Sequence, residues 1–421
     1  MSKMIDSGVS WIGEVPSCWA LIRFKDKYVN VKEIAKENSI NYERLALTLN
    51  GVIKRPKDDS EGLQPKEFDG YQILRENDFI FKMIDLQNVS TSRVGLSSYT
   101  GLVSPAYIRF SPREAGQYNQ FVYYFLMCLY YNCVYNNLGG NGVRSALNAK
   151  DMGEFIIPYP AEDEQRRICA VLDKKIGGIN SLICNVQTQI EKLKSYRLSI
   201  VTEIVTKGLD PSVQMKDSEV EWIGEIPVNW DVVPINALFK IKKDIIGHEP
   251  DCVLSITQQG LRVKDISVNE GQMAANYDKY QIVNVGDFAM NHMDLLTGGV
   301  GISEYNGVTS PDYRVFVIRN TDMNPRFFLY VFEMYYRNRI FYAFGQGAAN
   351  VGRWRLPAQN FKTTYIPVAP INEQTAIVEY LDERMAQIDH LIAVKQKKIE
   401  KLEQYKKSLI YEYVTGKKEV S

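Results

Sequence analysis

The chain contains a large internal duplication, and this duplication constrains its fold more than any other feature. The segment 11–16, Trp-Ile-Gly-Glu-Val-Pro, returns at 222–227 as Trp-Ile-Gly-Glu-Ile-Pro, an offset of 211 residues. Later in each half, the pair Glu-Gln at 164–165 returns at 373–374, an offset of 209 residues. Two similar modules related by a pseudo-two-fold axis are therefore expected within one chain.

Length and composition are those of an ordinary globular protein. The 421 residues are 45% hydrophobic, which is enough for real cores in two modules. No apolar run approaches the ~18 residues of a membrane span, and no signal peptide opens the chain. The six cysteines form no Cys-x-x-Cys pair and the three histidines are scattered. We therefore expect a cytoplasmic protein with reduced thiols and no metal site.

The overall charge balance argues against a strongly basic, free-standing DNA-binding protein. The net charge is zero and the isoelectric point is near 6.9. DNA binding remains compatible with this balance if basic residues are local, or if partner subunits supply many of the phosphate contacts.

Each half repeats one plan, in which a mixed region is followed by a long segment that contains little glycine or proline. The mixed regions, with many short β-branched and aromatic runs, predict an α+β fold. The resulting fold class is two similar mixed α/β globular domains joined by two long helices, packed as an antiparallel coiled coil. The expected domains are a first globular domain at 1–160, a central helical spacer at 161–210, a second globular domain at 211–369 and a C-terminal helical spacer at 370–421.

The closing segment of each half predicts a helix of about 40 residues, roughly 60 Å long. Apolar residues recur at steps of three and four, so two such helices should bury their apolar stripes against each other. Gly177-Gly178 is expected to weaken the first helix, and the lysines at 395–407 are read as a solvated outer face. The residues expected in the contact between the helices are Leu172, Ile179, Ile190, Leu193, Leu381, Ile388, Ile399 and Leu402.

A search for catalytic motifs finds none with convincing spacing. The chain has no P-loop, no Gly-x-Ser-x-Gly, no His-Glu-x-x-His and no Pro-Pro dipeptide. The glycines at 344–347 follow a predicted aromatic helix instead of a strand, which is the wrong context for a dinucleotide-binding loop. These absences favour a non-catalytic binding or scaffolding protein.

Glycine-rich loops with Arg and Asn, at 139–145 and 346–355, are the best candidates for contact with DNA. Glycine allows the backbone to approach a phosphate, and Arg and Asn suit the edges of guanine and adenine. The alternative is a turn with a structural arginine, and Arg144 and Arg353 are equally compatible with anchoring the DNA backbone. Basic residues at equivalent places elsewhere in the two halves are further candidates. Together with the loop residues, the candidate DNA-binding residues are Lys54, Arg55, Lys82, Arg93, Asn141, Arg144, Arg262, Lys264, His292, Asn350, Arg353 and Arg355.

Three features of the chain resemble the specificity subunits of type I restriction–modification systems. They are the doubled Trp-Ile-Gly-Glu-x-Pro segments, the Ile-Pro before each long helix (157–158 and 366–367) and the joint at 205–211. The resemblance implies two DNA target-recognition domains whose spacer helices set the gap between half-sites. It also implies that two methyltransferase subunits and motor–nuclease subunits dock on this chain. S-adenosylmethionine, ATP and Mg would then be bound by those partners, and no cofactor by this chain.

The mixed regions are far less alike than the helical segments, which predicts two different half-sites and an asymmetric double-stranded DNA target. A coiled-coil assembly scaffold without DNA sequence preference is the main alternative, and it is slightly favoured by the neutral charge. An autonomous enzyme with an unfamiliar site is a third possibility, for which the purified chain alone should show turnover.

Overall fold

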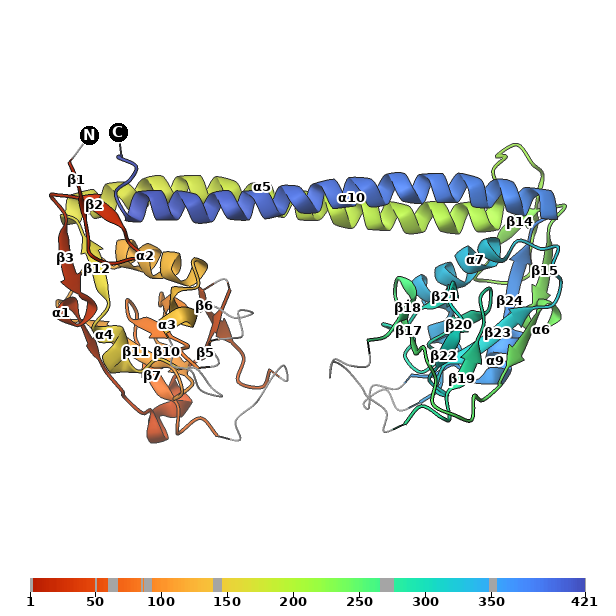
Figure 1. The fold of residues 1–421 in the computed structure, drawn as a ribbon, viewed down its shortest axis with the longest axis horizontal. Helices are drawn as coiled ribbons and strands as arrows, with labels where there is room; N and C mark the ends of the chain where they lie inside the picture. Colours follow the sequence, from red (N-terminus) through yellow and green to blue (C-terminus); the bar gives the residue numbers. More distant parts are fainter. Residues whose placement is uncertain are drawn as a thin grey trace. The chain divides into compact units, whose positions relative to one another are not determined.

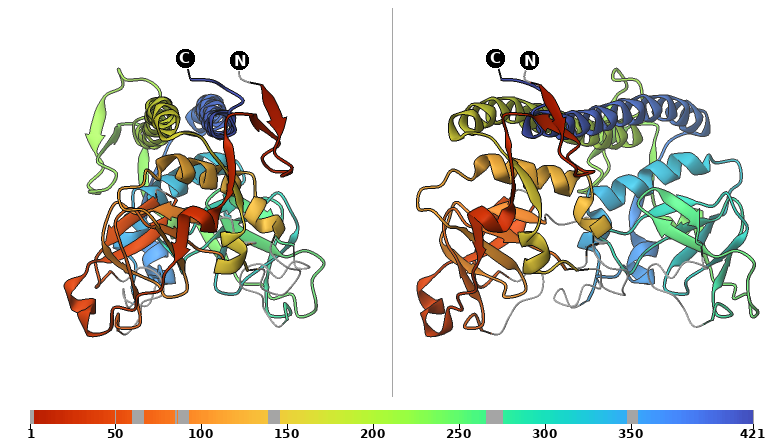
Figure 2. Two further views of the ribbon diagram at one scale, coloured as in Figure 1. Left: turned by 90° about the vertical axis from the view of Figure 1, so that its left-hand side faces the viewer. Right: turned by 60° about the vertical axis from the view of Figure 1, so that its left-hand side comes forward.

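A computed structural model of the chain describes residues 3–49, 51–59, 67–84, 86, 93–138, 146–265, 276–347 and 354–420. The chain divides into two compact units (Figure 1). Unit 1 combines Met1–Val186 with Lys397–Ser421, and unit 2 is the continuous stretch Gln187–Gln396. Unit 1 therefore contains both ends of the chain, which lie side by side (Figure 2).

The globular domain of unit 1 is built from two four-stranded sheets and two separate strand pairs. One sheet has the order β4-β11-β8-β9 and the other the order β6-β5-β10-β7. The strands of these sheets are β4 (Tyr28–Asn30), β5 (Arg44–Thr48), β6 (Gly51–Arg55), β7 (Gln72–Leu74), β8 (Phe79–Phe81), β9 (Val94–Leu96), β10 (Gly101–Val103) and β11 (Ile108–Pro112). The separate pairs are β1 (Met4–Asp6) with β2 (Glu14–Pro16), and β3 (Ala20–Arg23) with β12 (Ile156–Tyr159). The helices are α1 (Phe24–Lys27), the 3-10 helix η1 (Lys36–Asn41), α2 (Gln120–Tyr131), α3 (Val134–Leu138) and α4 (Ala149–Gly153).

The globular domain of unit 2 repeats this plan. Its main sheet has the order β16-β23-β20-β21, formed by β16 (Phe239–Lys242), β20 (Phe288–Met290), β21 (Val300–Ile302) and β23 (Arg314–Ile318). In place of the second sheet it has the pairs β17 (Leu254–Thr257) with β18 (Gly260–Val263), and β19 (Gln281–Val283) with β22 (Gly307–Thr309). A single parallel bridge from Val253 to Val308 links the two pairs. The remaining elements are β13 (Met215–Asp217), β14 (Glu225–Pro227), β15 (Asp231–Pro234), β24 (Tyr365–Val368), α6 (Ile235–Leu238), α7 (Pro325–Arg337), α8 (Ile340–Ala343) and α9 (Ala358–Thr363).

The two globular domains keep equivalent aromatic pairs in their cores. In unit 1, the rings of Tyr28 and Phe79 meet edge to face, with centroids 5.1 Å apart. In unit 2, Phe239 and Phe288 do the same at 5.4 Å. Edge-to-face pairs contribute about 0.5–1.5 kcal/mol beyond the burial of their surface. The aromatic-rich helices are α2 and α7, and their buried faces join these clusters.

The closing segments form the predicted long helices, α5 (Glu162–Lys207) and α10 (Ile371–Val414). Within unit 1, the first part of α5 packs on the last part of α10, and Ile168 and Leu172 share a core with Leu409 and Tyr413. Within unit 2, the last part of α5 packs on the first part of α10. The two helices are therefore antiparallel. No helix in the described ranges has an apolar stretch of the length needed to cross a bilayer.

Gly177 and Gly178 do not interrupt α5, contrary to the expected weak point. Added side chains at these positions would meet no atom within 4 Å, so both glycines lie on the open side of the helix. Because the opposite side packs in the core of unit 1, tertiary contacts outweigh the low helix propensity of glycine.

Each globular domain is tied to a long helix by one equivalent hydrogen bond. In unit 1 the hydroxyl of Tyr124 in α2 donates to Asp173 in α5. In unit 2 the hydroxyl of Tyr330 in α7 donates to Oδ1 of Asp382 in α10, at 2.6 Å. This bond couples the position of each domain to that of its helix.

Candidate nucleic-acid interface

Lys54 and Arg55 lie on β6, the outer strand of the β5–β6 hairpin. The Nζ of Lys54 lies 2.5 Å from Oε2 of Glu43, and Arg55 lies 3.7 Å from Asp59. The hydrogen bond that Lys54 donates to Glu43 raises the pKa of Lys54. Both cations thus have carboxylate partners, with which a DNA phosphate would compete.

Arg262 and Lys264 lie at the equivalent hairpin of unit 2. Arg262 on β18 is exposed and its guanidinium donates to the side chain of Gln259. Lys264 follows β18, and its backbone N–H donates to the carbonyl of Val253 at 2.8 Å. Basic residues therefore occupy the outer strand of the same hairpin in both units.

Lys82 and Arg93 lie side by side in unit 1, because the N–H of Lys82 donates to the carbonyl of Arg93 at 2.9 Å. Lys82 is half-buried, whereas Arg93 is completely buried. The guanidinium of Arg93 donates to the carbonyls of Ile84 and Leu86, at 3.3 and 3.2 Å. In this structure Arg93 holds a loop together and presents no surface to a duplex, which corrects its sequence-based assignment as a DNA contact.

His292 and Arg355 come together in unit 2. The backbone of Leu356, next to Arg355, donates to the carbonyl of His292 at 2.8 Å. Arg355 is exposed, whereas Nδ1 of His292 is buried and has no hydrogen-bond partner in the described part of the chain. Burial, and then the positive charges of Arg314 and Arg355, lower the pKa of His292 to about 4. His292 is therefore neutral near pH 7 and offers hydrogen bonds instead of a charge.

Arg314 was not among the predicted site residues, although it adjoins His292. It lies on β23 and is 5% exposed. Its Nη2 donates to the carbonyl of Leu356 at 2.9 Å, and its guanidinium lies 4.8 Å from the ring centre of Phe361. Among the described residues no carboxylate forms an ion pair with it, and burial lowers its pKa to about 10. A charged residue in the apolar run at 313–318 was the sequence signal that could have identified it.

Asn141, Arg144, Asn350 and Arg353 lie outside the described residues, but the anchors of their loops are described. In unit 1, the N–H of Leu147 donates to the carbonyl of Met83 at 3.1 Å. The bond from Leu356 to His292 is its counterpart in unit 2. Gln346 and Arg355 also exchange two backbone hydrogen bonds, at 2.8 and 3.1 Å. Each glycine-rich loop thus returns to an equivalent place, beside Met83 in one unit and His292 in the other.

Comparison with known proteins gives a consistent result. Residues 22–192 match the family described as "Type I restriction modification DNA specificity domain". The chain is 27% identical over 291 residues to the putative type I restriction enzyme MjaX specificity subunit of Methanocaldococcus jannaschii, covering 65% of this chain and 62% of that subunit. It is 23% identical over 423 residues to the MjaVIII specificity subunit of the same organism, covering 96% and 93%. The chain is thus similar to specificity subunits of type I restriction–modification systems, and the family model matches its residues 22–192.

A solved structure has the same fold as this chain. That chain, described under "Structural basis underlying complex assembly and conformational transition of the type I R-M system", is 12% identical and gives a TM-score of 0.63. The superposition covers 96% of this chain and 99% of the other. Fold similarity therefore extends well beyond the residues that match the family.

The residues predicted to form the contact between the long helices lie on the packed sides of α5 and α10. Leu172, Ile179, Ile190, Leu381 and Ile388 are buried. Leu193, Ile399 and Leu402 are partly buried against the same cores. Their steps of three and four residues continue through Arg197 and Lys406, which are cations at positions where an apolar residue is usual.

These two cations occupy equivalent positions and reach across to the other helix. Arg197 lies 3.5 Å from the carboxylate of Asp389 in unit 2. In unit 1, Lys406 donates to the side chain of Asn180 at 3.2 Å. Lys395 likewise donates to Gln189 at 2.5 Å. Lys406 and Lys395 thus contact the other helix instead of belonging to a purely solvated face.

Over the described ranges, no group of three or more His, Cys, Asp or Glu side chains is arranged to hold a metal ion.

Proposed function

We propose that this chain is a specificity subunit, a non-catalytic reader of a split, asymmetric DNA target, with one half-site bound by each globular domain. The observation that carries the proposal is the repeated loop anchor. The same backbone bond fixes a glycine-rich, Arg-containing loop in both units, yet the anchoring residue is Met83 in one and His292 in the other. Met83 is buried and His292 is half-buried, so these residues shape the base of each loop. A shared anchor with different side chains beneath it is compatible with two different half-sites.

The chain should be co-expressed with its methyltransferase partner, and adenine methylation should be mapped across the genome. We expect methylation at one bipartite motif whose halves differ. Methylation without a split motif, or mobility shifts of the assembled complex that show no sequence preference, would favour the coiled-coil scaffold instead.

We propose that α5 and α10 set the gap between the half-sites. Both helices run from one unit into the other, with 46 and 44 residues respectively. A seven-residue insertion after Gln189 and another before Lys398 would preserve the spacing of the apolar stripe. Two further turns add about 10 Å, which corresponds to about three base pairs of B-DNA. The methylated motif should gain that spacing and keep its half-sites, whereas an unchanged gap would refute this role.

The long helices also carry equivalent exposed apolar residues, which suit the docking of two copies of one partner. Leu182 and Leu391 are 50% and 47% exposed, and Tyr196 and Tyr405 are 56% and 53% exposed. Each pair is related by the offset of 209 residues. Each unit thus has one such leucine and one such tyrosine, contributed by different helices. We assign these positions to two methyltransferase subunits, with motor–nuclease subunits joining the assembled core.

A further inference from the structure

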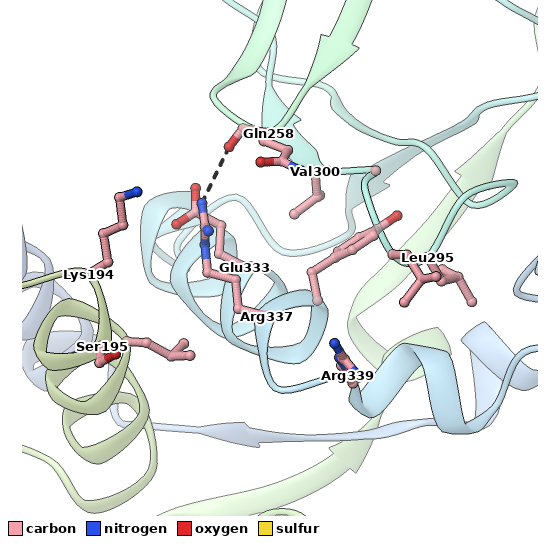
Figure 3. Close-up of a pocket in the computed structure, with 13 residues that line it drawn as sticks. Lys194, Ser195, Gln258, Leu295, Val300, Glu333, Arg337 and Arg339 are labelled. Carbon is pink, nitrogen blue, oxygen red and sulfur yellow. Dashed lines mark hydrogen bonds between the residues drawn. The ribbon is translucent and has the colours of Figure 1, made fainter. Parts of the chain in front are cut away.

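Unit 2 contains a polar pocket of about 360 Å³ where its globular domain meets α5. Lys194 and Ser195 of α5 form one side, and Glu333 and Arg337 of α7 form the floor. Gln258, in the turn between β17 and β18, closes the top, where its carbonyl accepts a hydrogen bond from Arg337 at 3.5 Å (Figure 3). Arg339, at the start of α8, completes the lining.

The lining of this pocket is positively charged. Lys194, Arg337 and Arg339 are all exposed, and Glu333 is the acidic residue among them, which leaves a net charge of +2. Lys194 forms an exposed ion pair with Glu191 at 2.9 Å, of the kind that contributes little to stability. In the described part of the chain, neither Arg337 nor Arg339 has a carboxylate within 4 Å. These cations are therefore accessible to an external anion.

The fold does not require this charge. At the equivalent positions of unit 1, at an offset of 206 residues, Met127 stands for Glu333, Tyr131 for Arg337 and Cys133 for Arg339. The backbone is nevertheless the same, because Cys133 and Arg339 both have a positive φ, of 55° and 60°.

The helix side of the pocket differs in the same way. Lys194 and Leu198 correspond to Glu403 and Lys407 of α10, at an offset of 209 residues. Lys407 lies over the ring of Tyr131, 5.5 Å from its centre. Glu403 and Lys407 carry opposite charges that cancel, so the described residues of unit 1 do not repeat the cationic lining.

We propose that this pocket is a phosphate-binding site that holds the DNA backbone beside the half-site read by unit 2. The proposal rests on the proposed DNA-reading function and adds a contact that carries no sequence information. Arginine presents a planar fork of donors that matches a phosphate, and the pocket of about 360 Å³ has room for a phosphodiester group. Such contacts fix the register of a protein on DNA and leave the choice of bases to other residues.

Glu333 makes the proposal directly testable, because it opposes the binding of an anion. Glu333→Gln should tighten DNA binding, since one negative charge is removed from the lining. If the pocket instead bound an amine or another cation, the same change would weaken binding of that ligand and would leave DNA affinity unchanged.

The experiment measures DNA binding by the complex of the full chain with its methyltransferase partner. Fluorescence anisotropy is followed between 50 and 200 mM salt, with one duplex that contains the methylated motif and one with both half-sites scrambled. The variants are the double substitution Arg337→Gln with Arg339→Gln, the single Glu333→Gln, and Arg319→Gln as a control for an exposed arginine of unit 2 outside the pocket. Thermal melting verifies that each variant is folded.

The double variant should lose the same factor of affinity on both duplexes. The slope of log affinity against log salt should become shallower by about 0.9 for each phosphate contact removed. Glu333→Gln should gain affinity and Arg319→Gln should behave as the parent. An unchanged slope in the double variant overturns the proposal. A second result would also overturn it: inorganic phosphate raises the melting temperature of the parent but not of the double variant, while both bind DNA equally well. Failure of the proposed function looks different, because the parent complex would then bind both duplexes equally.

Discussion

The carboxylate of Asp78 lies 2.6 Å from Nε of Arg109, and both side chains are almost fully buried in unit 1. In unit 2 the equivalent carboxylate is Asp287, whose partner is Lys242 at 2.7 Å. Arg109 lies on β11 and Lys242 on β16, so the two domains neutralise the same buried carboxylate from different strands. The domains have thus diverged within their cores as well as at their surfaces, while keeping one arrangement of strands.

Arg109→Met should destabilise unit 1 strongly. The substitution leaves Asp78 buried without its cation, which costs about 3–5 kcal/mol for a buried pair. The free energy of unfolding by urea measures the effect. Arg166→Met is the matched control, because its ion pair with Glu162 is exposed and should contribute no more than about 1 kcal/mol.

Arg314→Met should change the stability of unit 2 by less than about 1 kcal/mol, because Arg314 is buried without a carboxylate and its removal relieves an unpaired charge. The lost hydrogen bond to Leu356 offsets that gain. Urea unfolding of Arg314→Met and Arg109→Met under the same conditions compares the two buried arginines. A loss of unfolding free energy as large as that of Arg109→Met would show that other interactions in the folded protein balance the buried charge of Arg314.

His292 should make the folded chain less stable as the pH falls. Its pKa is about 4 in the folded chain against 6.5 for the free side chain, so the unfolded chain takes up the proton first. The stability contribution is intact above pH 6.5 and is lost between pH 6.5 and pH 4, with about 2 kcal/mol lost by pH 5. Urea unfolding at pH 7 and pH 5 should show this loss in the parent and not in His292→Asn. An equal pH dependence in both proteins would contradict it.

Arg144→Ala and Arg353→Ala should each weaken binding to the target duplex by about 1–3 kcal/mol if the side chains read bases. Each substitution should relax the preference at one half-site and leave the other unchanged. Competition between duplexes that differ in a single half-site measures this. Equal losses on all duplexes would assign these arginines to the DNA backbone, and unchanged affinity in both would remove the glycine-rich loops from the interface.

Leu182→Asp combined with Leu391→Asp should release the methyltransferase subunits without unfolding this chain, because both leucines are about half exposed. Size-exclusion chromatography with light scattering measures the stoichiometry, and each single variant should retain one copy. The control is the pair Lys174→Asp and Glu383→Asp, which changes exposed residues of the same helices elsewhere. Retention of two copies by the double variant would place the docking surface elsewhere.

The long helices were predictable from the sequence because one apolar period continues over more than forty residues. The strands at 72–74 and 79–81 were also recognisable as a pair of short runs. Their partners were not, because β7 pairs with β10 and β8 pairs with β9 and β11, which are distant choices that a local pattern does not encode. The separation of basic surface residues from structural ones likewise depends on burial. Arg93 and Arg314 became distinguishable from Lys54 only once the strands around them were in place.

Unit 1 is assembled from both ends of the chain, and this determines when it can fold during synthesis on the ribosome. The second unit is a continuous stretch and has all its parts once residue 396 has emerged. The first unit still lacks Leu409, Ile410, Tyr413 and Val414, which complete its core. The domain that is translated first is therefore the last to be finished, and a nascent or prematurely terminated chain leaves the apolar side of α5 uncovered, a surface that chaperones and proteases recognise.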